Sequence, residues 1–252
     1  MVNFCASLTT IPSRIREVSL TIDSLINQTK KPEKIFLNIP YKYERFPEQV
    51  ISTEHIEKLR NYKNLEIIRC EDFGPGTKLL GSINNLEKYS HIVLVDDDHV
   101  YQKDMFEIFL NEALKNSDNA YSFCVYDIED LKVGQGADGF MINTNYLKNI
   151  LLFFNNYVKK NKSLFLNDDL WISIYLNKCL NVEIESLNKF LKKRFFSGNK
   201  SIYKKHTTID ALIELYEKDR KKARNLRHQE SFFEYNMLKK ITNNFSNIKF
   251  KE

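Results

Sequence analysis

Short apolar runs alternate along the chain with longer stretches in which apolar residues recur every three or four positions. The short runs are rich in β-branched and aromatic residues and therefore predict strands. These strands are expected at residues 3–8, 34–39, 65–70, 92–95, 120–125 and 182–187. The stretches with helical spacing predict helices, which are expected after a cap at Ser13 and then at about residues 53–61, 77–88, 103–116, 145–160 and from about 166. Strands that alternate with helices in this way indicate an α/β fold whose first strands pair in parallel.

Two segments depart from this alternation. Residues 133–142 hold three of the seven glycines, which is typical either of a tight hairpin or of a backbone that approaches a ligand closely. Beyond the last predicted strand, residues 189–205 are basic and loop-like, and residues 208–244 have the pattern of two amphipathic helices. We expect one main domain over residues 1–190, with residues 191–252 packed on it as a basic loop and helices.

The composition narrows the class of protein. A chain of 252 residues with 42% apolar content can bury a large core. Its net charge of +5 comes from interspersed lysines and acids, so it does not indicate a nucleic-acid partner. The four cysteines lie far apart without metal-ligand spacing, which predicts free thiols in a reducing compartment. No apolar run approaches the roughly 20 residues of a membrane span and no signal peptide is recognised, so we expect a cytoplasmic protein.

The strongest chemical signal follows the apolar run 92–95, which leads directly into Asp96, Asp97, Asp98 and His99. Ligands of open α/β sheets bind beyond the carboxyl ends of the strands, where this run places its acids. Carboxylates this close together require a partner if they are buried, which points to a bound cation. A turn followed by a helix N-cap is the alternative. The buried character of the preceding strand favours the cation, and we expect Asp96 and Asp98 to hold it.

A second acid pair, Asp168 and Asp169, opens a predicted helix. Helix capping accounts for one such carboxylate, with a contribution of about 1 kcal/mol. The other can act as a general base toward a substrate hydroxyl, because neighbouring negative charge raises its proton affinity.

Several basic residues and one histidine complete the candidate chemistry. Arg14 and Lys78 each lie shortly after a predicted strand end and are candidate contacts for an anion such as a diphosphate. The basic run 192–194 is a further candidate, although such runs are more often solvated surface. His206 follows the basic loop and can fold back onto the metal, since imidazole suits Mn²⁺ and similar ions. His99 adjoins the acids and alternatively faces solvent or caps the next helix.

Taken together and in this order, these motifs resemble those of GT-A nucleotide-sugar glycosyltransferases, in particular the small family-2-like group. The resemblance covers about residues 3–187 and rests on the segments Ser7–Arg14, Asp72–Lys78, Asp96–Asp98, Gly136–Gly139 and Asn167–Ser173. It implies a Rossmann-like, mostly parallel central sheet flanked by helices, and here a C-terminal helical extension follows. The second segment resembles the loop near the nucleotide, and the third matches the family's Asp-x-Asp metal motif.

The resemblance also implies roles for individual residues. Donor contacts are implied for Thr9, Thr10, Arg14, Asn38, Asp72, Lys78, Asp96, Asp97, Gly136 and Asp138. A metal site for Mn²⁺ or Mg²⁺ is implied at Asp96 and Asp98, and a histidine after the core, here His206, often completes it. Asp169 is the implied catalytic base. Asp168 is the alternative, because Asp-Asp stands here where many relatives have Glu-Asp.

We therefore expect metal-dependent transfer of a sugar, with inversion, from a nucleoside diphosphate sugar to a hydroxyl of a glycan, protein or lipid-linked acceptor. The expected donor is a UDP-sugar. The alternatives are a retaining enzyme of the same fold and a non-catalytic nucleotide-sugar-binding protein. A sugar-1-phosphate nucleotidyltransferase is disfavoured, because its chemistry requires a glycine-rich loop after the first strand and residues 9–14 contain no glycine.

Overall fold

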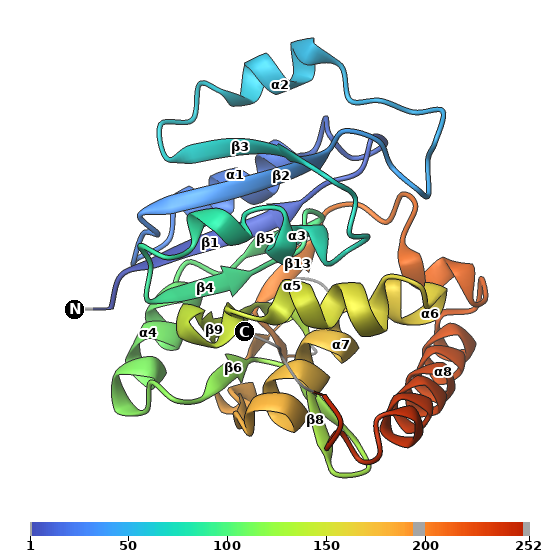
Figure 1. Ribbon diagram of the computed structural model, residues 1–252. Coiled ribbons are helices and arrows are strands. Elements are labelled where there is room, and N and C mark those ends of the chain that lie inside the picture. The colour runs from blue at the N-terminus through green and yellow to red at the C-terminus, as the bar shows by residue number, and fades with distance from the viewer. Residues whose placement is uncertain (1, 194–199, 249–252) are drawn as a thin grey trace.

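A seven-stranded sheet forms the centre of the computed structural model, which describes residues 2–193 and 200–248 (Figure 1). The strand order is β10-β6-β9-β4-β1-β2-β3. The strands are β1 Phe4–Thr9, β2 Lys34–Pro40, β3 Leu65–Cys70, β4 His91–Leu94, β6 Ala120–Ser122, β9 Phe140–Asn143 and β10 Ile184–Ser186. All neighbours pair in parallel except β9, which is antiparallel to both β4 and β6. The predicted α/β class with a mostly parallel sheet is confirmed.

Helices cover both faces of this sheet. They are α1 Val18–Ile26, α2 Thr53–Leu59, α3 Thr77–Leu80, α4 Met105–Lys115, α5 Ile150–Phe153, α6 Lys162–Phe165, α7 Asp168–Ile174 and α8 Arg220–Ile241. Strand β4 shows how the apolar run forms the core: Ile92 and Leu94 pack into one cluster with α5 and α7, while Val93 and Val95 pack into the other with α1 and α4. A strand buried on both faces explains why this run lacks polar alternation.

Two helix starts differ from the sequence expectation. Helix α1 begins at Val18, after turns at residues 12–17, and Ser13 instead donates a hydrogen bond to Asp210 at 2.5 Å. The helix expected over 77–88 is the four-residue α3 followed by a 3-10 turn, Ile83–Asn85. Its N-cap is Gly76, while the hydroxyl of Thr77 accepts a hydrogen bond from the amide of Phe73.

The region after α4 contains elements that the sequence did not predict. The run 120–125 divides into β6 and the first residue of β7 Val125–Ile128, which pairs with β8 Leu131–Gly134 as a hairpin. The glycine-rich segment continues into the antiparallel strand β9. Helices α5 and α7 each continue into a π-helical segment, Phe154–Val158 and Tyr175–Cys179.

The C-terminal region returns to the carboxyl end of the sheet. Strand β13 Tyr203–Lys205 pairs antiparallel with β5 His99–Tyr101, which directly follows the aspartates. A short strand pair, β11 Lys192–Lys193 and β12 Lys200–Ser201, precedes it. A 3-10 turn, Leu212–Leu215, and one long helix α8 replace the two expected amphipathic helices. Within the described residues, no helix is long and apolar enough to cross a bilayer.

Candidate active site

The chain turns sharply after β4, and this turn sends three consecutive carboxylates to three different partners. Asp96 contacts Lys78, Asp97 contacts Thr10 and Arg14, and Asp98 lies beside His99. The turn lies at the carboxyl end of the parallel strands, where open α/β sheets bind their ligands. It borders a cleft of about 480 Å³.

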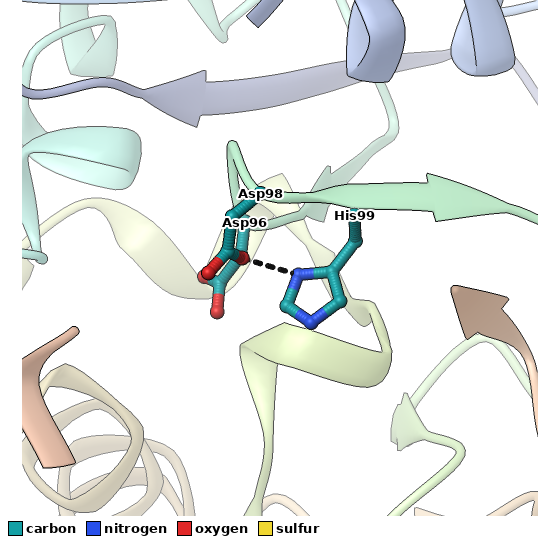
Figure 2. A group of neighbouring side chains, drawn as sticks. All are labelled: Asp96, Asp98 and His99. Carbon is teal, nitrogen blue, oxygen red and sulfur yellow. Dashed lines mark ion pairs between the residues drawn. The ribbon is translucent and has the colours of Figure 1, made fainter. Parts of the chain in front are cut away.

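Asp98 and His99 carry the features of a metal site. Their side chains are almost completely buried, each residue being 2% exposed, and Asp98 Oδ1 lies 2.6 Å from His99 Nδ1. Neither atom has hydrogen-bond geometry with any partner in the described chain. Figure 2 shows the carboxylates of Asp96 and Asp98 side by side, with the imidazole of His99 turned toward them. Carboxylate oxygens and an imidazole nitrogen within 4.8 Å of one another suit Mn²⁺ and similar ions.

Neighbouring groups hold this cluster in place. The ring of Tyr203 on β13 meets the ring of His99 edge to face at 3.8 Å. Lys205 Nζ lies 2.7 Å from Asp98 Oδ2. Burial by itself would raise the pKa of Asp98, but His99 and Lys205 outweigh it and hold that pKa well below its ordinary value. Asp98 is therefore ionised and available as a ligand at neutral pH.

Asp97 and Arg14 form a buried pair. Arg14 Nη1 donates to Asp97 Oδ1 at 2.8 Å and lies 3.3 Å from Asp98 Oδ2, and the hydroxyl of Thr10 donates to Asp97 Oδ2 at 2.7 Å. Burial raises the pKa of Asp97 and the charge of Arg14 opposes this effect. The pair joins the loop after β1 to the loop after β4, so these three residues fix the shape of the cleft floor.

Lys78 joins the two acid clusters that the sequence places 70 residues apart. Its Nζ lies 2.5 Å from Asp96 Oδ1 and 3.1 Å from Asp168 Oδ2, and the lysine is only 4% exposed. Burial opposes the charge of Lys78, but Asp168 and Asp96 outweigh it and raise the pKa of the lysine. A permanently charged lysine thus holds α7 against the aspartate turn.

Asp169 has a different environment from its neighbour. Its Oδ1 accepts a hydrogen bond from the amide of Gly136 at 2.8 Å. Burial, reinforced by the negative charge of Asp168, raises the pKa of Asp169 to about 7. A Cβ atom on Gly136 would lie 3.1 Å from Lys78 Nζ and 3.3 Å from Asp169 Oδ1. Of the two readings of the glycine cluster, the close approach of backbone to a functional group applies at Gly136, while Gly134 ends the β7–β8 hairpin.

Three further residues for which the resemblance implies donor contacts are Thr9, Asp72 and Asp138. Thr9 and Asp72 line the cleft; the Thr9 hydroxyl donates to the Asn38 carbonyl, and Asp72 accepts hydrogen bonds from the amides of Glu44 and Gly74. Asp138 is 6% exposed at the end of the turn that begins at Gly136. Thr9 and Asp72 therefore border the cleft, whereas Asp138 is not among the residues that line it.

Asn38 and His206 lie differently from the sequence expectation. The Asn38 amide is fully buried, donates to Ser7 Oγ at 2.8 Å, and is not among the residues that line the cleft. The ring of His206 faces α1, with Nε2 3.0 Å from Thr21 Oγ1, while its backbone amide donates to the carbonyl of Asp98. His99, not His206, supplies the imidazole of the ligand cluster in this structure. The predicted basic run 192–194 has side chains outside the described residues.

One wall of the cleft consists of residues that the sequence did not predict to lie there. It is formed by the C-terminal region, which contributes Tyr203, Lys204, Lys205, Asp210, Ala211, Leu212, Ile213, Arg220, Arg224 and Arg227. The spacing of the three arginines by four and three positions is the one local signal that they share a helix face.

Comparisons with known proteins agree with this fold. No family model matches the chain, and no curated protein matches it in sequence. The crystal structure of residues 1–349 of S. aureus TarS in complex with UDP is similar, with a TM-score of 0.54 and 14% identity over 99% of this chain and 76% of that one. The mannosyltransferase PcManGT from Pyrobaculum calidifontis, in complex with GDP-Man and Mn²⁺, gives a TM-score of 0.50 and 11% identity over 73% of this chain and 54% of that one. The chain therefore has the GT-A-like fold of these glycosyltransferases, as the motifs predicted.

Proposed function

We propose that the protein is a metal-dependent glycosyltransferase that moves a sugar from a nucleoside diphosphate sugar to a hydroxyl acceptor. The observation that carries the proposal is the meeting of two acid clusters at one cleft. Asp96, Asp98 and His99 form a potential metal site, and Asp168 and Asp169 lie across Lys78 from it. The solved structures of similar fold, which contain UDP or GDP-Man with Mn²⁺, support the choice of donor class.

The metal site would be formed by Asp96, Asp98 and His99, whereas the ring of His206, the ligand expected from the sequence, faces Thr21 on α1. A divalent ion there neutralises negative charge that develops on the departing diphosphate. Lys78 and Lys205 lie against the same aspartates and add fixed positive charge to this side of the cleft. Of the candidate ions, Mn²⁺ suits a mixed oxygen and nitrogen ligand set better than Mg²⁺.

Asp169 is the proposed general base, and Asp168 is the alternative. A base is most effective when its pKa lies near the working pH, and the raised pKa of Asp169 meets that condition. Asp168 lies 3.1 Å from Lys78 Nζ, so its carboxylate is engaged in holding that lysine. Asp169 would accept the proton of the acceptor hydroxyl as the hydroxyl attacks the anomeric carbon, which inverts the configuration at that carbon.

A thermal-shift screen of UDP-, GDP- and dTDP-sugars, with and without Mn²⁺, tests the donor and metal parts of this proposal. We expect at least one donor, a UDP-sugar first, to raise the Tm in the presence of Mn²⁺, because a ligand stabilises the folded state by its binding free energy. Asp98→Asn is expected to remove the Mn²⁺-dependent part of this shift. Equal shifts in the variant and the wild type would remove Asp98 from the metal site.

Stereochemistry separates the proposed inverting reaction from a retaining one. The first-formed product, followed by proton NMR, is expected to have the anomeric configuration opposite to that of the donor. Retention would exclude Asp169 as a simple base. Donor binding without turnover in any acceptor mixture would instead support a non-catalytic nucleotide-sugar-binding protein.

A further inference from the structure

Three arginines on one face of α8 line the cleft. Arg220, Arg224 and Arg227 are separated by four and three positions, which places them on the same side of the helix. Helix α8 contacts α6, α7 and β7, and in Figure 1 it lies beside α6 and α7. These three arginines, called the arginine stripe below, are thus part of the site already described, although the proposed reaction gives them no role.

The arginine stripe reaches the start of α7, the helix that carries the proposed base Asp169, through Arg227. Arg227 Nη2 donates to Asn167 Oδ1 at 3.2 Å, and Asn167 directly precedes Asp168 at the start of α7. The cations that contact the metal-binding aspartates are different residues, namely Arg14 and Lys205 at Asp98 and Lys78 at Asp96. The stripe is therefore connected to the helix that carries the proposed base, while other cations contact the metal-binding aspartates.

The stripe has unused binding capacity. Arg220 and Arg224 are exposed and make no ion pair or hydrogen bond with any residue that the structure describes. Arg227 Nη1 is buried and lacks a hydrogen-bond partner within the same part of the chain. Four of the aspartates that line the cleft, Asp96, Asp97, Asp98 and Asp168, are already paired with Lys78, Arg14 or Lys205. Guanidinium groups in this state favour carboxylate or phosphate groups, which they bind with two parallel hydrogen bonds.

We propose that Arg220, Arg224 and Arg227 form an acceptor subsite for an anionic chain, one that carries phosphate or carboxylate groups beside the hydroxyl that receives the sugar. The assignment of this subsite to the acceptor rests on the proposed function. Binding of an anionic chain to the stripe does not depend on it, so the two can fail separately.

The test measures binding of three probes to the full chain without any sugar donor: inorganic polyphosphate, hyaluronan oligosaccharides and neutral dextran oligosaccharides. Polyphosphate presents phosphates and hyaluronan presents carboxylates, so the preferred probe identifies the anion. We expect one anionic probe to bind, dextran not to bind, and the double variant Arg220→Ala/Arg224→Ala to weaken binding about tenfold. Binding is also expected to weaken as salt rises.

Lys221→Ala/Lys222→Ala is the matched control, because it removes the same charge from the same turn of α8 at exposed residues that do not line the cleft. The control is expected to bind the probe within about twofold of the wild type, because Lys221 and Lys222 project from other faces of α8 and make no direct contact with the bound chain. Equal loss in the two double variants would overturn the proposal in favour of general surface charge. No binding of either anionic probe would also overturn it.

The donor screen provides a second readout. The arginine variant is expected to keep the Mn²⁺-dependent Tm shift given by the nucleotide sugar. Loss of that shift would assign the stripe to the donor diphosphate and overturn the acceptor subsite. A screen in which no donor binds even the wild type would refute the proposed function while leaving anion binding by the stripe to be judged from the three probes.

Discussion

Replacement of Asp169 by asparagine is predicted to stabilise the protein while it abolishes turnover. The carboxylate of Asp169 is half-buried beside Asp168, and the partial burial and the neighbouring charge together raise its pKa to about 7 from an ordinary value of 3.8. A carboxyl group whose pKa is raised on folding destabilises the folded state once the pH exceeds its unfolded value. Asparagine is close to isosteric, can still accept the hydrogen bond from the Gly136 amide, and carries no charge.

The size and pH window of this effect follow from the raised pKa. The unfolded state loses its proton near pH 4 and the folded state near pH 7, so the cost grows between these values and is constant above them. The full shift corresponds to roughly 4 kcal/mol. Solvent reaches this carboxylate, and screening reduces the figure to about 1 to 2 kcal/mol. For a chain of this size, that is a Tm increase of about 2 to 8 °C at pH 8.

The assay compares Asp169→Asn with the wild type by thermal unfolding at pH 5 and pH 8, together with turnover. The gain in Tm is expected at pH 8 and should shrink at pH 5, while turnover falls about 10²- to 10⁴-fold. Asp168→Asn is the control: it removes a partner of the buried Lys78 and is expected to lower the Tm at pH 8. A lower Tm for Asp169→Asn, or a Tm shift that is equal at both pH values, would show that the charge of Asp169 does not destabilise the folded state.

Three further predictions concern the groups around the metal site. Arg14→Met is expected to lower the free energy of unfolding in urea by about 3 to 5 kcal/mol, because it leaves the buried Asp97 without its main charge partner; a loss below 1 kcal/mol would contradict the buried pair. Gly136→Ala is expected to reduce turnover about tenfold with little change in Tm, because the added Cβ displaces Lys78 Nζ; unchanged kcat would contradict this close approach. His99→Ala is expected to weaken Mn²⁺ binding at least tenfold in an electron paramagnetic resonance titration, and unchanged affinity would exclude the imidazole as a ligand.

The order of the main elements could be predicted because local patterns determine it. Strand β4 was recognisable from four apolar residues that lead into charge, and its burial on both faces follows from that pattern. The same holds for β1, β2 and β3 and for the helices between them. The motifs at the strand ends then indicated the fold, since parallel strands bring their carboxyl ends together at one edge.

The parts that could not be predicted depend on residues far apart in the chain. Ser13 has the chemistry of a helix cap, yet its hydroxyl binds Asp210, which lies 197 positions away. The imidazole beside the aspartates belongs to His99 because β5 pairs with β13, and each of these strands has only three residues. Such short strands carry no periodic signal.

The spacing of the three aspartates already favours one division among them. Residues two positions apart project to the same side of an extended chain, which favours Asp96 and Asp98 as the pair that faces a cation. The structure places these two carboxylates together with His99 and turns Asp97 toward Arg14.

The most direct test of the central claim is release of nucleoside diphosphate from a panel of nucleotide sugars by the purified protein with Mn²⁺, measured by chromatography. We predict release from at least one UDP-, GDP- or dTDP-sugar, its suppression by a chelator, and its loss in both Asp98→Asn and Asp169→Asn. Absence of release from every donor together with absence of donor binding would contradict the proposed glycosyl transfer, as would release that neither the chelator nor the two variants reduce.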